Sequence, residues 1–297
     1  MNAPSLRGAI TALVTPFHAD GRLDEPALRA LVQWQLDEGI DGLVPVGSTG
    51  EAATLTLPER VRVVQITAEV VAGRVPVIAG TGASDTAAAL ENSAALAAAG
   101  ASHLLHVSPA YNKPPQRGLL AHFRAVADAA AVPVVLYNVP GRTASNMEAD
   151  TTLALAEHPN IVAVKEASGN LVQIAEIIRR RPAGFAVLSG DDPLTLAVMA
   201  HGGEGILSVV SNAAPAAMHA LAAAAAAGDL VRARALHDQL ALLFGAAFVE
   251  SNPIPIKAAL AAMGRIGNVL RLPLVPLDER HAPALRRALV AAGALVP

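Results

Sequence analysis

Short β-branched apolar runs alternate with helical patterns along most of this 297-residue chain, and this alternation constrains the fold more than any other feature. The runs predict strands at residues 9–14, 42–46, 75–79, 102–107, 132–137, 161–165, 185–189 and 205–210, each followed by a predicted helix. Strands joined by helices form parallel sheets, and eight such units in one block predict a closed (β/α)8 TIM barrel. An open doubly wound sheet is the alternative, although no Gly-x-Gly-x-x-Gly motif follows the first predicted strand.

The residues beyond the eighth unit predict a helical extension. Three further helical patterns cover residues 230–248, 254–263 and 278–292, with prolines between them. No linker or low-complexity segment separates them from the preceding units. We therefore expect a barrel over residues 1–228 and a three-helix extension over residues 229–297, which would cover one face of the barrel or build a subunit contact.

Composition narrows the classes of protein to which the chain can belong. Hydrophobic residues make up 53% of it, enough for a large core, and the net charge of −3 gives no sign of binding to nucleic acid or an anionic membrane. The absence of cysteine excludes disulfides, thiolate zinc sites and a cysteine nucleophile. Residues 205–228 are uncharged and long enough to cross a bilayer, but polar residues and a proline divide them into a predicted strand and a buried helix. No basic-then-apolar leader opens the chain, so we expect a cytoplasmic protein.

Lys165 ends the predicted strand at 161–165 and is one of only three lysines, with Lys113 and Lys257. An ammonium ion held where water solvates it poorly loses its proton more readily, and the neutral amine is a nucleophile. Only Lys165 directly ends a β-branched run. The alternative is a strand-end lysine that extends into solvent.

Other reactive side chains follow the predicted strands, at the end where TIM barrels carry their chemistry. Ser48 and Thr49 lie in a Gly-Ser-Thr-Gly loop, whose backbone N–H groups and hydroxyls could bind a carboxylate. Tyr111 and Tyr137, the only two tyrosines, could relay protons, and Arg142 could bind a second carboxylate. An ordinary turn, packed aromatic rings and a solvated arginine are the alternatives.

Four acidic residues also follow predicted strands: Glu51, Glu166, Asp191 and Asp192. Their spacing matches no metal-binding pattern, and Asp191 and Asp192 precede Pro193 as helix caps do. We therefore expect no metal site. His103 and His106, on the predicted strand at 102–107, are interpreted as structural.

Together these groups suit Schiff-base chemistry on a keto acid. The lysine amine adds to the ketone, water leaves, and the protonated imine withdraws electrons from the neighbouring carbon. Loss of a proton there gives an enamine that attacks an aldehyde. A buried hydroxyl relay could contribute roughly 100- to 10,000-fold to these proton transfers. This chemistry requires no metal and no organic cofactor.

The motifs resemble those of the dihydrodipicolinate synthase / N-acetylneuraminate lyase family, and they follow the family's order along nearly the whole chain. The matching segments are Thr15-Pro16-Phe17, Gly47-Ser48-Thr49-Gly50-Glu51, Ala79-Gly80-Thr81-Gly82, Tyr137-Asn138-Val139-Pro140-Gly141-Arg142-Thr143, Lys165-Glu166-Ala167-Ser168-Gly169, Leu188-Ser189-Gly190-Asp191-Asp192 and Asn252-Pro253-Ile254-Pro255-Ile256-Lys257. The resemblance implies a (β/α)8 barrel with a C-terminal helical segment, a homotetramer, and class I aldolase-type chemistry on pyruvate.

The resemblance also implies roles for individual residues. Lys165 matches the Schiff-base lysine, and Tyr137 matches the acid/base tyrosine beside it. Ser48 matches the hydroxyl that links this tyrosine to a second one, matched by Tyr111, which a neighbouring subunit contributes in the family. Thr49, with Ser48, matches the binder of the pyruvate carboxylate.

Three more residues are assigned to substrate binding: Arg142, Gly190 and Leu207. Arg142 matches the group that holds the second substrate's carboxylate, and it resembles the synthase branch because the sialic-acid lyases lack it. The synthase branch condenses pyruvate with L-aspartate-4-semialdehyde to 4-hydroxy-tetrahydrodipicolinate, on the route to diaminopimelate and lysine. The alternative is a pyruvate-dependent aldolase, lyase or dehydratase of a sugar acid, such as an N-acetylneuraminate lyase. A catalytically silent binding or assembly protein is the alternative from a different class.

The sequence departs from the family pattern in two places. Ser48 stands where the synthases more often have threonine, which preserves the hydroxyl. The residues of the lysine-inhibition site are also different, so we expect feedback inhibition to be weak or absent. The departing residues are Leu57, Arg60, Ser84, Ala88 and Ala110.

Overall fold

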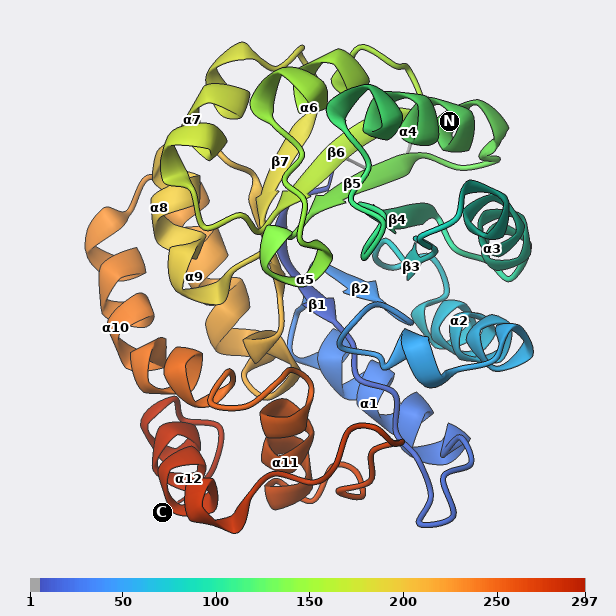
Figure 1. Cartoon of the computed structure of the whole chain (residues 1–297). Coiled ribbons are helices and arrows are strands. Elements are labelled where there is room, and N and C mark those ends of the chain that lie inside the picture. Colours follow the sequence, from blue (N-terminus) through green and yellow to red (C-terminus); the bar gives the residue numbers. More distant parts are fainter. Residues whose placement is uncertain (1–5, 297) are drawn as a thin grey trace.

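The computed structural model describes residues 6–296, and its centre is a barrel of eight parallel strands (Figure 1). The strands are β1 (Gly8–Ala12), β2 (Gly42–Val44), β3 (Ile78–Gly80), β4 (His103–Val107), β5 (Val134–Asn138), β6 (Ile161–Glu166), β7 (Ala186–Ser189) and β8 (Gly205–Ser208). β1 pairs with both β2 and β8, and a Leu43–Val77 bridge joins β2 to the segment before β3. The predicted (β/α)8 barrel is confirmed.

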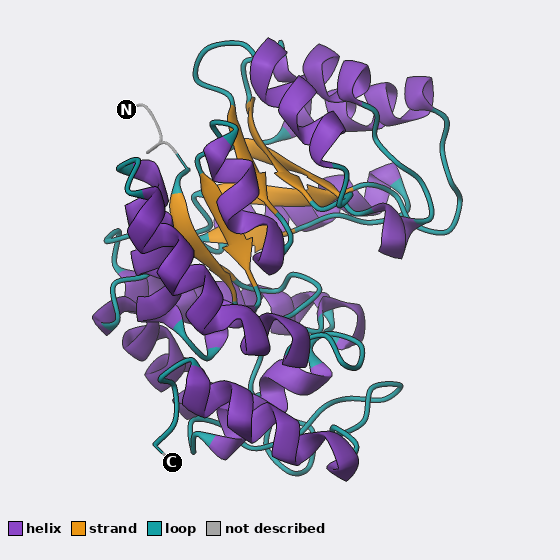
Figure 2. Ribbon diagram, turned by 90° about the vertical axis from the view of Figure 1, so that its left-hand side faces the viewer, coloured by secondary structure: helices purple, strands orange, loops and turns teal. Residues whose placement is uncertain are grey.

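Helices surround the strands, as Figure 2 shows from the side. The barrel helices are α1 (Glu25–Asp37), α2 (Leu57–Val71), α3 (Thr86–Ala98), α4 (Gln116–Ala129), α5 (Pro140–Thr143), α6 (Ala149–Ala156), α7 (Leu171–Arg180), α8 (Thr195–Ala200) and α9 (Pro215–Ala226). Side-chain caps define the first residues of several helices. At α1 the Asp24 carboxylate accepts a hydrogen bond from Ala27 N, and at α2 Thr56 forms a capping box with Glu59. Each cap satisfies backbone N–H groups that have no partner within the helix.

β2 ends at Val44, two residues before its predicted end. Pro45 has no backbone N–H to continue the sheet, and Val46 adopts a left-handed φ of 50°. The residues after β2 therefore leave the barrel wall abruptly and form the loop at its carboxyl end.

The core has an inner part and an outer part. Alternate strand residues such as Ile10, Leu105 and Leu188 fill the barrel interior. The other strand residues pack against the helices and form the larger hydrophobic clusters outside the barrel wall. Since alternate side chains of a strand point to opposite faces, neighbouring residues of one strand belong to different parts of the core.

The C-terminal helices form the predicted extension, at one side of the barrel in Figure 1. They are α10 (Leu230–Ala246), α11 (Ile254–Ala262) and α12 (Ala282–Ala291), and a short 3₁₀ turn (Glu279–His281) forms the predicted start of α12. α10 packs against α9 of the barrel and against α12. The division at residue 228 stays a prediction, because the extension and the barrel share this continuous packing.

Residues 205–228 form β8, a 3₁₀ turn (Val210–Asn212) and α9, so the predicted strand and buried helix are confirmed. Within residues 6–296, no helix combines the length and the apolarity that crossing a bilayer requires.

Candidate active site

Lys165 and Tyr137 lie side by side at the carboxyl ends of two neighbouring strands. β5 and β6 pair in a register that places Tyr137 opposite Lys165. The Lys165 Nζ atom lies 4.3 Å from the centre of the Tyr137 ring. Lys165 is 5% exposed, so its amine is within the barrel mouth and the alternative of a lysine extending into solvent is wrong.

Glu166 follows Lys165 but points to the other face of β6. Its carboxylate accepts hydrogen bonds from Asn138 Nδ2 at 3.0 Å and from Ser168 N at 2.8 Å, and Gln173 adds a third donor. Burial raises the pKa of Glu166, although these donors oppose the shift. Within residues 6–296 no carboxylate oxygen lies within 4.0 Å of the Lys165 amine, so Glu166 does not engage it in an ion pair.

A cavity of about 70 Å³ at the barrel mouth brings most of the predicted site residues together. It is lined by Lys165, Tyr137, Ser48, Thr49, Arg142 and Gly190, with Asp191 and Asn252. These residues come from the ends of β2, β5, β6 and β7 and from the segment before α11. The cavity therefore combines an amine, a phenol, two hydroxyls and a guanidinium, as predicted from the strand ends.

The loop at residues 46–51 carries the two hydroxyls and is strained at both ends. Val46 and Glu51 have left-handed φ values of 50° and 55°, which are unusual for residues other than glycine, and especially for a β-branched valine. Among the described residues, the backbone N–H groups of Ser48 and Thr49 donate to no protein oxygen. These two N–H groups are therefore available to a carboxylate.

Gly190 lets the end of β7 approach β6 closely. A Cβ atom at this position would lie 2.5 Å from the Cβ of Ala167, and Gly190 N donates to the Glu166 carbonyl at 2.7 Å. Leu207, by contrast, is fully buried in the interior core and does not line the cavity. The structure therefore places Gly190 at the cavity but keeps the Leu207 side chain beneath it.

Tyr111 does not reach the cavity of its own chain. It lies in the loop after β4, has a φ of 73° and is 94% exposed. Ser48 is also exposed and lines the cavity, together with a cleft of about 490 Å³ that shares Tyr137 and Arg142 with it. In a single chain, the side of the site that carries the Ser48 hydroxyl is therefore open to solvent.

The predicted helix-cap role of Asp191 and Asp192 is wrong. Neither side chain caps the helical turn that follows it. Asp192 is fully buried and accepts hydrogen bonds from the Ser208 hydroxyl and from Val209 N at 3.0 Å, so it ties β7 to the turn after β8. Burial raises the pKa of Asp192, and it also raises that of Asp191, where the positive charge of Lys165 opposes the shift.

Three of the four acidic residues that follow the strands, Glu51, Glu166 and Asp192, make separate side-chain contacts, and Asp191 lines the cavity. Glu51 accepts from the Lys257 ammonium group at 2.6 Å, and both side chains are fully buried.

His106 is predicted to be structural. Its Nε2 atom forms hydrogen bonds with the Thr81 hydroxyl at 2.7 Å and with the Ser93 hydroxyl at 3.0 Å. Burial lowers the pKa of His106 to about 3, so the ring is neutral at physiological pH.

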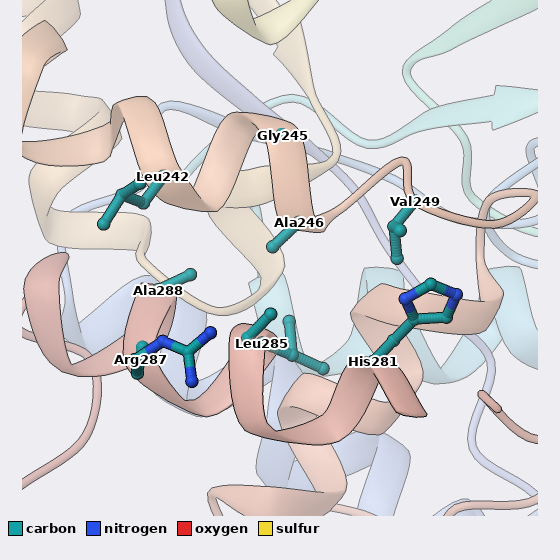
Figure 3. Close-up of a pocket in the computed structure, with 9 residues that line it drawn as sticks. Leu242, Gly245, Ala246, Val249, His281, Leu285, Arg287 and Ala288 are labelled. Atoms are coloured by element: carbon teal, nitrogen blue, oxygen red, sulfur yellow. The ribbon is translucent and has the colours of Figure 1, made fainter. Parts of the chain in front are cut away.

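A further hollow of about 290 Å³ lies within the extension, between α10 and α12 (Figure 3). Its walls are mostly apolar, with Leu242, Ala246 and Leu285 among them, and His281 and Arg287 add polar groups. It contains none of the predicted site residues. The barrel mouth remains the candidate active site.

Two residues of the extension line the active-site cavity but were not assigned to it from the sequence: Phe248 and Asn252. Asn252 lies in the family motif at residues 252–257, and this motif is the sequence feature that could have indicated its place in the site. Phe248 follows α10 and carried no signal, because an apolar residue at a helix end is common.

Comparisons with known proteins agree with this geometry. The model of the dihydrodipicolinate synthetase family matches residues 5–292. A 4-hydroxy-tetrahydrodipicolinate synthase from Ralstonia nicotianae is 48% identical over 290 residues, covering 98% of this chain and 99% of the relative. One from Koribacter versatilis is 50% identical over 291 residues, covering 98% of this chain and 97% of the relative.

Solved structures give the same result. The chloride-inhibited dihydrodipicolinate synthase from Acinetobacter baumannii, in complex with pyruvate, superposes with a TM-score of 0.96 at 43% identity, covering 98% of this chain and all of the other. The Thermotoga maritima enzyme has a TM-score of 0.96 at 41% identity, with coverage of 98% and 100%. With its barrel, its lysine–tyrosine pair and these matches over nearly the full length, the chain belongs to the dihydrodipicolinate synthetase family.

Proposed function

We propose that this chain is a class I aldolase-type lyase that condenses pyruvate with L-aspartate-4-semialdehyde to 4-hydroxy-tetrahydrodipicolinate. One observation carries the proposal: the buried Lys165 amine lies beside Tyr137 in a cavity that also holds Thr49 and Arg142. The relatives' names favour the synthase reaction over the sugar-acid alternative. The retained lysine and tyrosine argue against a silent assembly protein.

The reaction begins with pyruvate. Its carboxylate binds at the loop of Ser48 and Thr49, where backbone N–H groups are free. The Lys165 amine then adds to the keto carbon, and water leaves as a protonated imine forms. Tyr137, next to the amine, gives and takes the protons of these steps.

The imine draws electrons from the methyl carbon of pyruvate, which loses a proton to give an enamine. This carbon attacks the aldehyde carbon of the second substrate, and the aldehyde oxygen becomes a hydroxyl. Arg142, exposed at the cavity entrance, binds the second substrate's carboxylate. The amine of L-aspartate-4-semialdehyde then replaces Lys165 at the imine carbon, which closes the ring and frees the enzyme.

We further propose that the chain acts in the cytoplasm as a homotetramer and that Tyr111 serves the site of a neighbouring copy. Its exposure and its distance from the cavity of its own chain support this role, because a relay through Ser48 needs a phenol from outside. Leu207 then contributes to substrate binding through its place in the core beneath the cavity.

The test is reduction with borohydride in the presence of pyruvate, followed by mass analysis of peptides. We expect a pyruvate adduct on Lys165 and none in Lys165→Ala, since only a covalent imine is trapped by reduction. Lys113→Ala is the matched control, because Lys113 lies in the loop after β4 and does not line the cavity. Turnover of L-aspartate-4-semialdehyde completes the test, and an adduct elsewhere or turnover of sugar acids alone would contradict the proposal.

A further inference from the structure

Asn252, from the extension, touches both of the proposed carboxylate-binding groups. Its Nδ2 donates to the Thr49 hydroxyl oxygen at 2.9 Å, and its backbone carbonyl accepts from Arg142 Nη2 at 3.5 Å. Asn252 is 7% exposed and lines the cavity. Its Oδ1 atom is buried and has no partner among the described residues. Among the described residues, the Asn252 amide is therefore hydrogen-bonded through its Nδ2 end alone, and the partner of that end is Thr49.

The direction of the Asn252–Thr49 hydrogen bond determines what the Thr49 hydroxyl does. A threonine hydroxyl has one proton to donate and lone pairs with which to accept. Because Thr49 accepts from Asn252, its own proton is free to point elsewhere. A carboxylate in the cavity accepts only, so it needs a hydroxyl that donates.

The loop that carries Thr49 is also held by the extension. Lys257 of α11 donates to the Glu51 carboxylate at 2.6 Å and to the Thr15 carbonyl at 2.9 Å. The Thr15 hydroxyl in turn donates to the Gly50 carbonyl at 2.7 Å. These contacts fix the strained loop, whose left-handed residues would otherwise relax.

We propose that Asn252 is a positioning residue that sets the Thr49 hydroxyl as the donor to the pyruvate carboxylate. This inference rests on the proposed function. Asn252 acts through Thr49, because its Nδ2 atom donates to the hydroxyl oxygen and leaves the hydroxyl proton for the pyruvate carboxylate. The extension is therefore part of the active site.

The experiment measures the pyruvate concentration that gives half-maximal trapping of Lys165 by borohydride, together with KM and kcat. Asn252→Ala should raise the half-saturating pyruvate concentration about 2- to 13-fold, the effect of one lost hydrogen bond, and should change kcat less than KM. Asn268→Ala, the same change at an exposed position of the extension, is the matched control and should have no effect.

A double-mutant cycle separates positioning from a general structural role. Thr49→Val alone should weaken pyruvate binding, and adding Asn252→Ala should then have little further effect, because no hydroxyl remains to be oriented. If Asn252 only supported the fold, its effect would be the same with Thr49 or Val at position 49. Independent, additive effects would therefore overturn the inference.

Asn252→Asp keeps the side-chain volume and gives a second readout. The ionised aspartate can only accept, so the Thr49 hydroxyl donates its hydrogen bond to the aspartate instead of to pyruvate, and pyruvate binding weakens. As pH falls and the new carboxyl group protonates, it regains a donor, and pyruvate affinity relative to the wild type should recover. A pH-independent ratio, or an unchanged half-saturation in Asn252→Ala, would overturn the inference. A wild-type chain that traps no pyruvate would instead refute the proposed function itself.

Discussion

The buried ion pair between Lys257 and Glu51 gives the sharpest stability prediction. Both side chains are fully buried, and the Nζ–Oε1 distance is 2.6 Å. Lys257→Met removes the cation but keeps a side chain of similar length. Glu51 then retains the hydrogen bond from Arg271 N, at 3.1 Å, and loses its directly paired cation, because the Arg271 guanidinium is paired with Glu59 and acts on Glu51 only through its charge. Burial lowers the pKa of Lys257, which the nearby Glu51 opposes, so the pair depends on mutual neutralisation.

The expected loss follows from the cost of an uncompensated buried charge, about 3–5 kcal/mol of unfolding free energy. For 297 residues the unfolding entropy is on the order of 0.6 kcal/mol/K, so Tm should fall by about 5–8 °C. The assay is reversible urea unfolding with a thermal scan on the same samples. Adding Glu51→Gln to Lys257→Met should recover part of the loss, because the neutral amide still accepts from Arg271 N.

The control is Arg179→Met, which breaks an ion pair with Glu176 at 2.8 Å whose side chains are 69% and 37% exposed. Solvent screens this pair, so we expect no measurable change in unfolding free energy. If the unfolding free energy of Lys257→Met were also within about 1 kcal/mol of that of the wild type, the reasoning from a buried charge would be refuted.

Two further predictions concern the relay and the core. Tyr137→Phe should lower kcat by about 100- to 10,000-fold without lowering Tm, and near-normal turnover would contradict the acid/base role. Burial lowers the pKa of His106 to about 3, whereas the pKa in the unfolded chain is about 6.5. Between these two pH values the unfolded chain binds a proton at His106 that the folded chain does not bind. The free energy of unfolding therefore falls as the pH falls below about 6.5. At pH 4.5 this one group should cost about 2–3 kcal/mol relative to pH 7, and urea unfolding of His106→Asn should show a correspondingly smaller loss. An equal loss in both proteins would assign the pH dependence to other groups.

The barrel and the family were predictable from local sequence. Strand and helix periodicity is a local property, and eight alternating units leave few folds that can bury them all. Lys165 and Tyr137 end predicted strands, so the barrel rule predicts that both lie at the same mouth, and the Lys165 Nζ atom does lie 4.3 Å from the centre of the Tyr137 ring. The family motifs, which cover nearly the whole chain, agree with the match over residues 5–292.

The sequence did not predict contacts between side chains far apart along the chain. Asn252 bonds Thr49 across 203 positions, and Lys257 pairs with Glu51 across 206. The sequence predicts that Asp192 caps the helix beside it, yet its carboxylate accepts hydrogen bonds from Ser208 and from the turn after β8. A buried carboxylate requires several hydrogen-bond donors, and for Asp192 this requirement outweighs the local preference for capping the neighbouring helix.

The sequence by itself determined the chemistry, because the order of strand ends decides which reactive groups share one mouth of a barrel. Only the tertiary structure decided how those groups are held: the amine free of a carboxylate, the loop fixed by the extension, and Tyr111 outside its own cavity. The physical reason is that residue type sets what a group can donate, accept or attack. Burial and partners, which depend on the whole fold, set whether it does so.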